Sequence, residues 1–149
     1  MNNWYECKVR YDKEQAEGAV KSVSESYLID AYSVTEAETR LRTELEPFTS
    51  LGEMVISSVK KEKIAELFLS DSEMDDKYYR CRVNFISIDE KRGVEKKKPM
   101  TMIVKAGSLV SAVSRLDKAL REGMVDTQIA SVVETNIMDV FTADLTAKN

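Results

Sequence analysis

Aromatic and basic side chains alternate along two segments of this 149-residue chain, residues 4–11 and 78–85. Successive side chains of a β-strand point to opposite faces, so every second residue of each segment would share one face of its strand. In the first segment these side chains are Trp4, Glu6, Lys8 and Arg10, and in the second they are Tyr78, Arg80, Arg82 and Asn84. Bases of a single-stranded nucleic acid can stack on such rings while the cations contact its phosphates. The pattern therefore marks a candidate binding surface.

The candidate nucleic-acid-binding residues are the aromatic and cationic members of this face: Trp4, Lys8, Arg10, Tyr78, Arg80 and Arg82. An alternative interpretation needs no ligand, because the same pattern keeps a sheet face wet and places rings at the edge of the core. The net charge of −4 argues against strong long-range attraction of polyanions, but it does not decide what a local groove binds.

A second basic segment lies at residues 89–98. It holds five cations and three carboxylates: Lys91, Arg92, Lys96, Lys97, Lys98, Asp89, Glu90 and Glu95. As an extension of a hairpin, this segment could reach over a bound nucleic-acid backbone. The alternative is an ordinary exposed loop.

Catalytic signatures are missing from the sequence. It contains no histidine, which removes the commonest general base and the commonest metal ligand. The acidic run at residues 70–76 lacks the glycine turn and terminal glutamate of a calcium loop, so it is predicted to be a solvated linker. The five glycines are scattered and form no phosphate-binding loop. We expect no enzyme, no cofactor and no metal site; a carboxylate pair assembled by the fold is the remaining route to catalysis.

Cys7 and Cys81 are the two cysteines, and each stands between apolar or aromatic residues on one side of a predicted strand. We interpret them as reduced, buried and inert core thiols. A disulfide would require the two strands to lie together. A structural zinc site would need more ligands than two cysteines supply in a chain without histidine.

Both basic-aromatic segments belong to an internal repeat. Residues 27–41 match residues 102–116, residues 4–11 match 78–85, and residues 56–68 match 129–141. In chain order the offset between the copies is 74, then 75, then 73 residues, so it changes by only one or two residues between segments, as insertions in loops would cause.

Each copy predicts one helix that begins after a serine. Ser33 and Ser108 suit the N-cap, since their side-chain oxygens can accept hydrogen bonds from free amides of the first turn, and Glu36 completes a capping box with Ser33. The helices are expected at residues 34–45 and 109–121. Apolar side chains recur there with helical spacing and would face a sheet: Val34, Ala37, Leu41, Leu45, Leu109, Ala112, Val113, Leu116 and Leu120.

Strands are predicted at residues 4–11, 23–31, 56–68, 77–88, 99–106 and 127–141. The polar residues 12–22 and 89–98 would be the loops of two hairpins. Ile56 and Val59 are three residues apart and cannot share a face of an uninterrupted strand. A bulge or break is therefore predicted near residues 60–63, with pairing resuming at residues 64–68.

The elements predict an α+β fold of internally duplicated ββαβ units with pseudo-twofold symmetry, mostly antiparallel sheet and two covering helices. Halves of about 70 residues would have thin cores alone, so we expect a single domain over residues 1–149. It would consist of repeats at 3–69 and 77–141 joined by the acidic linker 70–76. No apolar run approaches the ~20 residues of a spanning helix, and the first residues lack signal-peptide features. We expect a cytoplasmic protein without a membrane partner.

Residues 27–31 with 33–38, residues 77–79 with 83–85, and the closing stretches 129–131 and 134–141 carry a resemblance to a known family. The chain resembles a family of uncharacterised domains that is common in Bacteroidota and in the tailed phages that infect them. The resemblance implies a cytoplasmic bacterial or phage setting, in which small non-enzymatic proteins of DNA metabolism or host conflict are common. It implies no mechanism.

Two functional hypotheses follow. The first is a non-catalytic nucleic-acid-binding protein, for single-stranded DNA, in a replication, recombination or phage setting. The second is a protein-interaction or small-ligand-binding protein whose duplicated halves, in a homo-oligomer, form pockets between them. A salt-dependent titration with oligonucleotides would separate the two.

Overall fold

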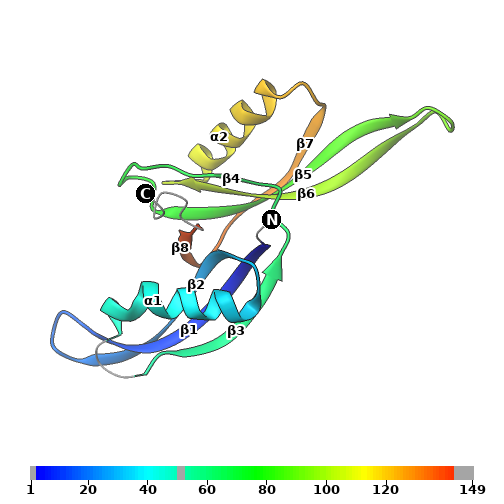
Figure 1. Cartoon of the computed structure of the whole chain (residues 1–149). Helices are drawn as coiled ribbons and strands as arrows, with labels where there is room; N and C mark the ends of the chain where they lie inside the picture. The colour runs from blue at the N-terminus through cyan, green and yellow to red at the C-terminus, as the bar shows by residue number, and fades with distance from the viewer. Residues whose placement is uncertain (1–2, 50–52, 143–149) are drawn as a thin grey trace, which may run out of the picture. The chain divides into compact units, whose positions relative to one another are not determined.

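The computed structural model describes residues 3–49 and 53–142. Within those ranges the chain forms two α-helices, one short 3-10 helix and eight strands, so it is an α+β protein (Figure 1). In chain order the elements are β1 (Asn3–Glu14), β2 (Val20–Ala31), α1 (Val34–Leu45), η1 (Glu46–Phe48), β3 (Val55–Glu62), β4 (Glu66–Phe68), β5 (Lys77–Asp89), β6 (Val94–Ala106), α2 (Leu109–Glu122), β7 (Thr127–Glu134) and β8 (Ile137–Phe141).

The chain forms two compact units, each with one helix and one four-stranded mixed sheet. Unit 1 draws its described residues from 1–63 and 136–149, and unit 2 from 64–135. The strand order is β3-β1-β2-β8 in unit 1 and β4-β6-β5-β7 in unit 2. In each sheet the first long strand pairs antiparallel with the strand that follows it and with the strand after the helix. The two units therefore have the same connectivity around their central strands.

The last strand of each predicted repeat lies in the sheet of the other unit. β4 pairs parallel with β6, from Glu66↔Met102 to Phe68↔Val104, and β8 pairs parallel with β2. The prediction that residues 56–68 and 127–141 each continue within one sheet is wrong. Only residues 63–65 lie between β3 and β4, and only residues 135–136 lie between β7 and β8, yet each short segment carries the chain from one sheet to the other. The acidic segment 70–76 consequently connects β4 and β5 within unit 2.

The predicted helix starts are confirmed. The Ser33 side chain accepts a hydrogen bond from the Glu36 amide at 3.1 Å, and the Ser108 side chain accepts one from the Ser111 amide at 3.2 Å. Glu36 in turn accepts from the backbone amide of Tyr32 at 2.8 Å. Each serine thereby satisfies an amide that the first turn of its helix leaves without an intrahelical partner.

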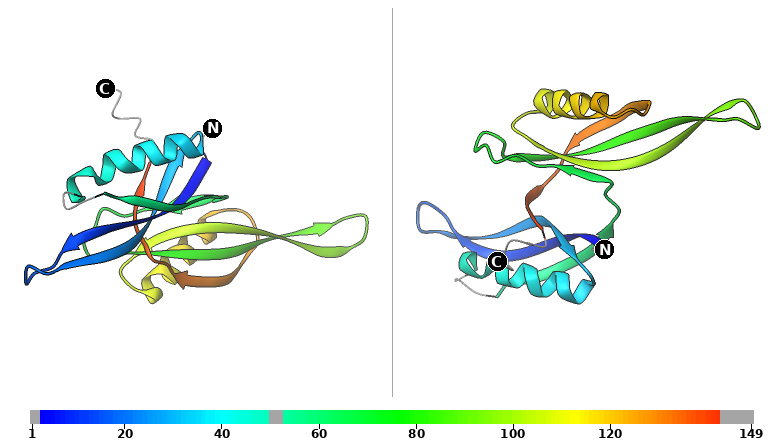
Figure 2. Two further views of the ribbon diagram at one scale, coloured as in Figure 1. Left: turned by 90° about the horizontal axis from the view of Figure 1, so that it is seen from below. Right: turned by 45° about the horizontal axis from the view of Figure 1, so that its top comes forward.

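Each helix packs on one face of the sheet in its own unit (Figure 2). The core of unit 1 joins Ala37, Leu41 and Leu45 of α1 to alternate residues of β1 and β2. In unit 2 only Ala112 and Leu116 of α2 are fully buried. Leu109 and Val113, which were expected to face the sheet, are exposed. Below, the outer face of a sheet means the face opposite its helix.

The two hairpins are longer than predicted. β1 and β2 pair as far as Glu14↔Val20, and β5 and β6 pair as far as Asp89↔Val94, so most of both expected loops is strand. The predicted break of the third strand near residues 60–63 is confirmed, since β3 ends at Glu62 and pairing resumes at Glu66 in β4. A bulge that was not predicted lies at Ser57, which is skipped in the register between Lys8↔Ser58 and Val9↔Ile56. Ala130 is the corresponding extra residue of β7. Such a bulge lets Ile56 and Val59 both face the core.

Candidate nucleic-acid interface

The outer face of unit 1 carries three of the predicted binding residues. Because Tyr5, Cys7, Val9 and Tyr11 are buried in the core, strand alternation places Trp4, Lys8 and Arg10 on the opposite face of β1. Lys8 and Arg10 are exposed, and Trp4 is partly buried. The predicted direction of these side chains is confirmed.

The cross-strand neighbours of the two exposed cations are uncharged, although Glu6 and Asp12 lie two residues away along β1 on the same face. Lys8 pairs with Ser26 on β2 and Ser58 on β3, and Arg10 pairs with Ser24 and Val55. Neither cation forms an ion pair within the residues that the structure describes. Their charges are therefore available to an anionic partner.

Lys60 is a further exposed cation, which sequence reasoning missed. It lies beside Glu6 on the neighbouring strand β3. The alternation of β3 could not reveal this position in advance, because the bulge at Ser57 reverses the facing of the residues that follow it.

In unit 2, β5 directs Tyr78, Arg80 and Arg82 toward the outer face, since Tyr79, Cys81 and Val83 belong to the core. Arg82 is exposed and pairs with Thr101 and Ser131, whereas Arg80 is partly buried. Arg82 is thus the cation of this strand that is most accessible.

The expectation that Tyr78 is exposed is wrong, since only 3% of this residue is accessible. Its cross-strand partner is Lys105, whose Nζ lies 5.5 Å from the centroid of the Tyr78 ring. Alternation predicted the direction of the ring but not what covers it. Because so little of the residue is accessible, the ring cannot serve as a platform for a base.

Two arginines anchor the helices to the sheets, and sequence reasoning missed them as well. The guanidinium of Arg40 on α1 donates to the backbone carbonyl of Asp30 at the end of β2, and Arg115 on α2 donates to that of Lys105 at 2.7 Å. The second guanidinium nitrogen contacts the segment after the exchanged strand: the Thr142 carbonyl at 2.6 Å in unit 1, and the Asp75 carboxylate at 2.9 Å in unit 2. The sequence carries a signal for these anchors, because an Arg-Leu pair occurs at matching positions of the two predicted repeats, residues 40–41 and 115–116.

Asp75 contradicts the prediction of a fully solvated acidic linker, because its side chain is only 6% exposed. A hydrogen bond from Ser70, followed by contacts with Arg115 and the Gly107 amide, holds the pKa of this carboxyl below its ordinary value. The backbone passes so closely that a Cβ at Gly107 would lie 2.5 Å from the Met74 carbonyl oxygen. The segment 70–76 is thereby fixed against the start of α2.

A polar cluster is built into the core of unit 1. The hydroxyls of Tyr11 and Tyr27 donate to the same carboxylate oxygen of Glu25, at 2.6 and 2.8 Å. Burial, and next the hydrogen bond to Glu25, raises the pKa of Tyr11 to about 12 and also raises that of Tyr27. The Tyr27 ring stacks on Phe141 of β8, with 5.5 Å between ring centroids. Both hydroxyls therefore remain donors at neutral pH, and the Tyr27 ring contacts the exchanged strand through its stack on Phe141.

The prediction of buried, unpaired thiols is confirmed, since Cys7 and Cys81 are both free and fully buried. Burial raises the pKa of each thiol to about 11. The thiolate that reacts with electrophiles or binds metal is correspondingly rare at neutral pH.

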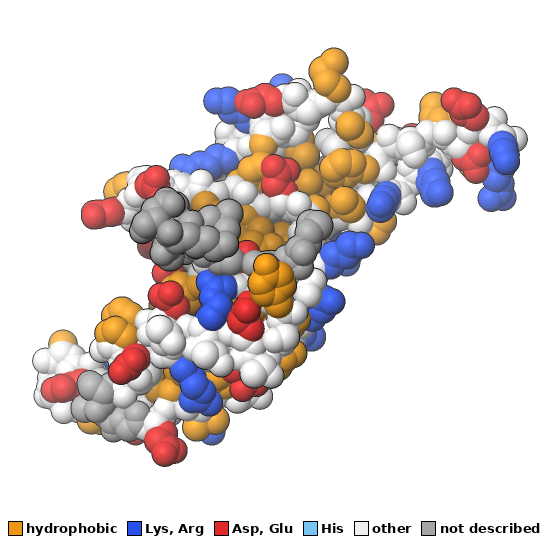
Figure 3. Space-filling view, viewed as in Figure 1, with side chains coloured by type: hydrophobic (Ala, Val, Ile, Leu, Met, Phe, Trp, Pro, Cys, Tyr) orange, Lys and Arg blue, Asp and Glu red, His pale blue; other side chains and the backbone are white. Residues whose placement is uncertain are grey.

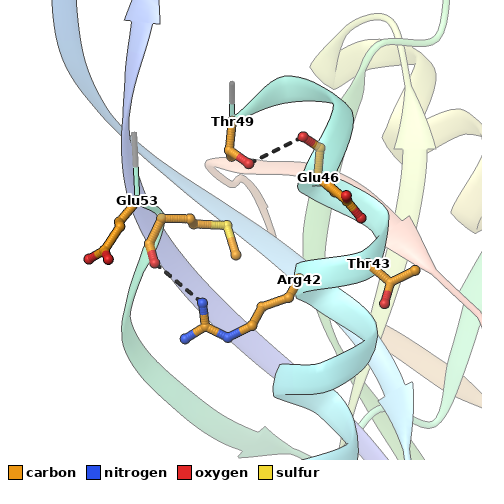
Figure 4. A pocket seen from close by; sticks show the side chains of 6 residues that line it. Arg42, Thr43, Glu46, Thr49 and Glu53 are labelled. Carbon is orange, nitrogen blue, oxygen red and sulfur yellow. Dashed lines mark hydrogen bonds between the residues drawn. The ribbon is translucent and has the colours of Figure 1, made fainter. Parts of the chain in front are cut away.

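Each unit has an open cavity between the end of its helix and the start of the next strand. The cavity of about 530 Å³ in unit 1 is lined by polar side chains and Met54, and Arg42 donates across it to the Met54 carbonyl (Figure 4). The cavity of about 580 Å³ in unit 2 is more apolar, with Leu120, Met124 and Ile129 in its wall. Within residues 3–49 and 53–142, no group of three histidine, cysteine or acidic side chains could hold a metal ion. No helix of the described chain is both long and apolar enough to cross a membrane.

The fold and the site define a class of α+β protein with two mixed sheets whose central strands present cations on their outer faces. The chain belongs to a family of domains of unknown function, DUF4494, whose model matches residues 3–143. The resemblance to an uncharacterised domain family that the sequence suggested is thereby confirmed. A comparison with curated proteins gives no match.

Proposed function

We propose that this protein is a non-catalytic nucleic-acid-binding protein, for single-stranded DNA, that acts in a replication, recombination or phage setting in the cytoplasm. The observation that carries the proposal is the pair Lys8 and Arg10 on the outer face of β1. Both are exposed, both have uncharged neighbours across the sheet, and neither is engaged in an ion pair with another described residue. Cations in such a position gain free energy from binding phosphates because counterions are released.

The candidate residues take different roles in this proposal. Lys8, Arg10 and Arg82 contact phosphates, and Trp4 offers its accessible part for stacking with a base. Arg80 is partly buried and contributes less. Tyr78 supports the sheet beneath Lys105 and does not touch the nucleic acid, because it is buried.

We also propose that the protein is a single domain that arose by internal duplication, with repeats at residues 3–69 and 77–141 related by a pseudo-twofold axis. Three correspondences support the duplication: equal strand connectivity, bulges at Ser57 and Ala130, and matching arginine anchors at Arg40 and Arg115. Exchange of the final strands between repeats follows naturally if the ancestor of each repeat formed a strand-exchanged dimer.

Fluorescence titration of a labelled single-stranded oligonucleotide, repeated at several salt concentrations, tests the binding proposal. Lys8→Gln, Arg10→Gln and Arg82→Gln should each weaken binding and flatten the slope of log affinity against log salt by roughly 0.7 for each phosphate that is no longer neutralised. Trp4→Ala should weaken binding by ~1–3 kcal/mol and leave that slope unchanged, since stacking releases no counterions. Lys118→Gln, an exposed cation on α2, is the matched control and should change neither quantity.

If the wild-type protein does not bind at low salt, or if the charge variants bind like wild type, the proposal fails. The hypothesis of a protein-interaction or small-ligand-binding homo-oligomer would then take its place. Sedimentation velocity of the wild-type protein would test for that assembly directly.

A further inference from the structure

The hairpin of unit 2 extends beyond the rest of its sheet. β7 pairs with β5 only as far as Phe85↔Thr127, and β4 pairs with β6 only at residues 102–104. The last backbone hydrogen bond to a neighbouring segment runs from the Ile86 amide to the Asp126 carbonyl, at 2.9 Å. Past that point β5 and β6 pair only with each other, and residues 86–98 form a projecting two-stranded ribbon, the hairpin arm (Figures 1 and 2).

The tip of the hairpin arm is a well-formed turn. The Asp89 carboxylate accepts hydrogen bonds from the Lys91 amide at 3.0 Å and from the Arg92 amide at 3.4 Å. The Asp89 carbonyl accepts from the Gly93 amide at 2.7 Å. Gly93 has a φ of +66°, which side chains other than glycine rarely tolerate. One of the three carboxylates of the arm is thus occupied by the turn itself.

The hairpin arm carries an excess of two positive charges. Its five cations are Lys91, Arg92, Lys96, Lys97 and Lys98, against Asp89, Glu90 and Glu95. All five cations are exposed, and none forms an ion pair with a described residue. The space-filling view shows lysine and arginine side chains along the projecting ribbon (Figure 3).

The corresponding hairpin of unit 1 provides an internal comparison. Its residues 11–23 hold Asp12, Glu14 and Glu17 against two lysines, and one of these, Lys13, lies 4.0 Å from the Glu25 carboxylate. The projecting hairpin of unit 1 thus forms without an excess of basic residues, so this topology does not require one. The excess of cations is a property of the unit 2 arm alone.

The chemistry of the arm favours the phosphates of a duplex. No aromatic residue occurs at positions 86–99, so the arm offers no platform for unpaired bases. A two-stranded β-ribbon fits the major groove of B-form DNA. Lys96 and Lys98 alternate with Lys97, so the ribbon presents cations on both of its faces and can contact the phosphates on either side of a groove.

We propose that the hairpin arm binds duplex DNA along the major groove through phosphate contacts. The inference rests on the proposed function in taking nucleic acid as the partner, and it adds a duplex contact to the single-strand contact of β1. Binding by lysines to phosphates is independent of sequence and strongly dependent on salt.

The test compares binding of a labelled duplex with binding of a single strand of equal length over a range of salt concentrations. The variant Lys96→Gln/Lys97→Gln/Lys98→Gln should bind the duplex about tenfold or more weakly at low salt, with the slope against log salt flattened by roughly 0.9 for each phosphate that is no longer neutralised. Its binding of the single strand should stay within about twofold of wild type, since the outer face of β1 is unchanged. Lys13→Gln/Lys21→Gln in the unit 1 hairpin is the matched control and should leave duplex binding unchanged.

The outcomes separate this inference from the proposed function. Wild-type binding of single strands but not duplex, or duplex binding unaffected by the triple variant, would overturn the inference and leave the proposed function standing. Binding of neither nucleic acid would refute both. Competition by polyglutamate as effective as that by duplex, compared per charge, would assign the arm to an acidic protein partner instead. If the triple variant does not melt like wild type, Lys97→Gln alone replaces it, with a flattening of roughly 0.9 expected.

Discussion

Tyr11 and Tyr27 of unit 1 share the carboxylate of Glu25, whereas unit 2 has Phe85, Met102 and Met100 at the matching positions of the sequence. The strand order around these positions is the same in the two units. One backbone arrangement therefore accepts either a hydrogen-bonded polar cluster or an apolar one. A buried polar cluster is tolerated when each polar group has a hydrogen-bond partner. An apolar replacement is tolerated when all polar groups of the cluster are replaced, so that none remains without a partner.

The arginine anchors differ between the units in a second way. Arg40 contacts a backbone carbonyl at Thr142, but Arg115 contacts the carboxylate of Asp75. A carbonyl does not change its charge with pH, whereas a carboxylate ceases to be an anionic partner when it takes up a proton. The anchor of unit 2 should therefore respond to acid, and that of unit 1 should not.

The largest losses of stability are expected for substitutions in the two cores, and the loss should be similar in unit 1 and unit 2. Leu41→Ala and Leu116→Ala each remove a fully buried side chain that packs between helix and sheet. Each should lower the free energy of unfolding by about 2–5 kcal/mol, because apolar burial decreases and a cavity remains. Urea unfolding followed by circular dichroism measures both. A decrease below about 1 kcal/mol for either would mean that its helix is not held by this packing.

A smaller decrease in the free energy of unfolding is expected when the polar cluster of unit 1 is disrupted, and two further substitutions should reverse it. Glu25→Met leaves two part-buried hydroxyls without their acceptor and should cost roughly 1–3 kcal/mol of unfolding free energy. The combination Tyr11→Phe/Glu25→Met/Tyr27→Met places the residue types of unit 2 at these three positions and should restore most of that stability. If the triple variant is no more stable than the single one, the two clusters are not interchangeable.

The anchor of Asp75 should make stability depend on acid. Its folded pKa lies below the ordinary value of 3.8, so the contribution of the carboxylate is present above pH 3.8 and declines as the pH falls through the folded pKa. Asp75→Asn should lower stability at neutral pH and remove this part of the decline below pH 3.8. Unfolding midpoints measured between pH 6 and pH 2 would show it. Parallel curves for wild type and variant would contradict the assignment.

The smallest effect is expected for the thiols, which the comparison treats as equivalent. A rise in thiol pKa from 9 to about 11 lowers the thiolate fraction about a hundredfold near neutral pH, and burial blocks access as well. Native protein should therefore resist a thiol reagent at Cys7 and Cys81 alike, and both should react once it is unfolded. Rapid labelling of one cysteine in the native state would break the equivalence.

Local pattern predicted the elements well. The serines at 33 and 108 predicted both helix starts, and alternation in residues 4–11 and 78–85 predicted which side chains face each core. These features depend on interactions within a few residues, such as a side chain accepting a bond from a nearby amide.

Features that depend on distant partners were not predictable in this way. The exchange of β4 and β8 depends on which sheet edge is free to pair with them, and the residues of a strand do not specify that edge. The cation beside the Tyr78 ring comes from Lys105 across the hairpin, and the ion-pair partner of Asp75 is Arg115 from α2. The spacing of Ile56 and Val59 requires an interruption between them, and the bulge at Ser57 supplies it, whereas the interruption predicted near residues 60–63 corresponds to the end of β3 at Glu62.

The most direct test of the central claim is a titration of wild-type protein into a labelled single-stranded oligonucleotide at low salt, repeated as salt is raised. Nucleic-acid binding through Lys8, Arg10 and Arg82 predicts saturable binding whose log affinity falls linearly with log salt, by roughly 0.7 for each phosphate contacted. Absence of binding at low salt, or an affinity that does not change with salt, would contradict it.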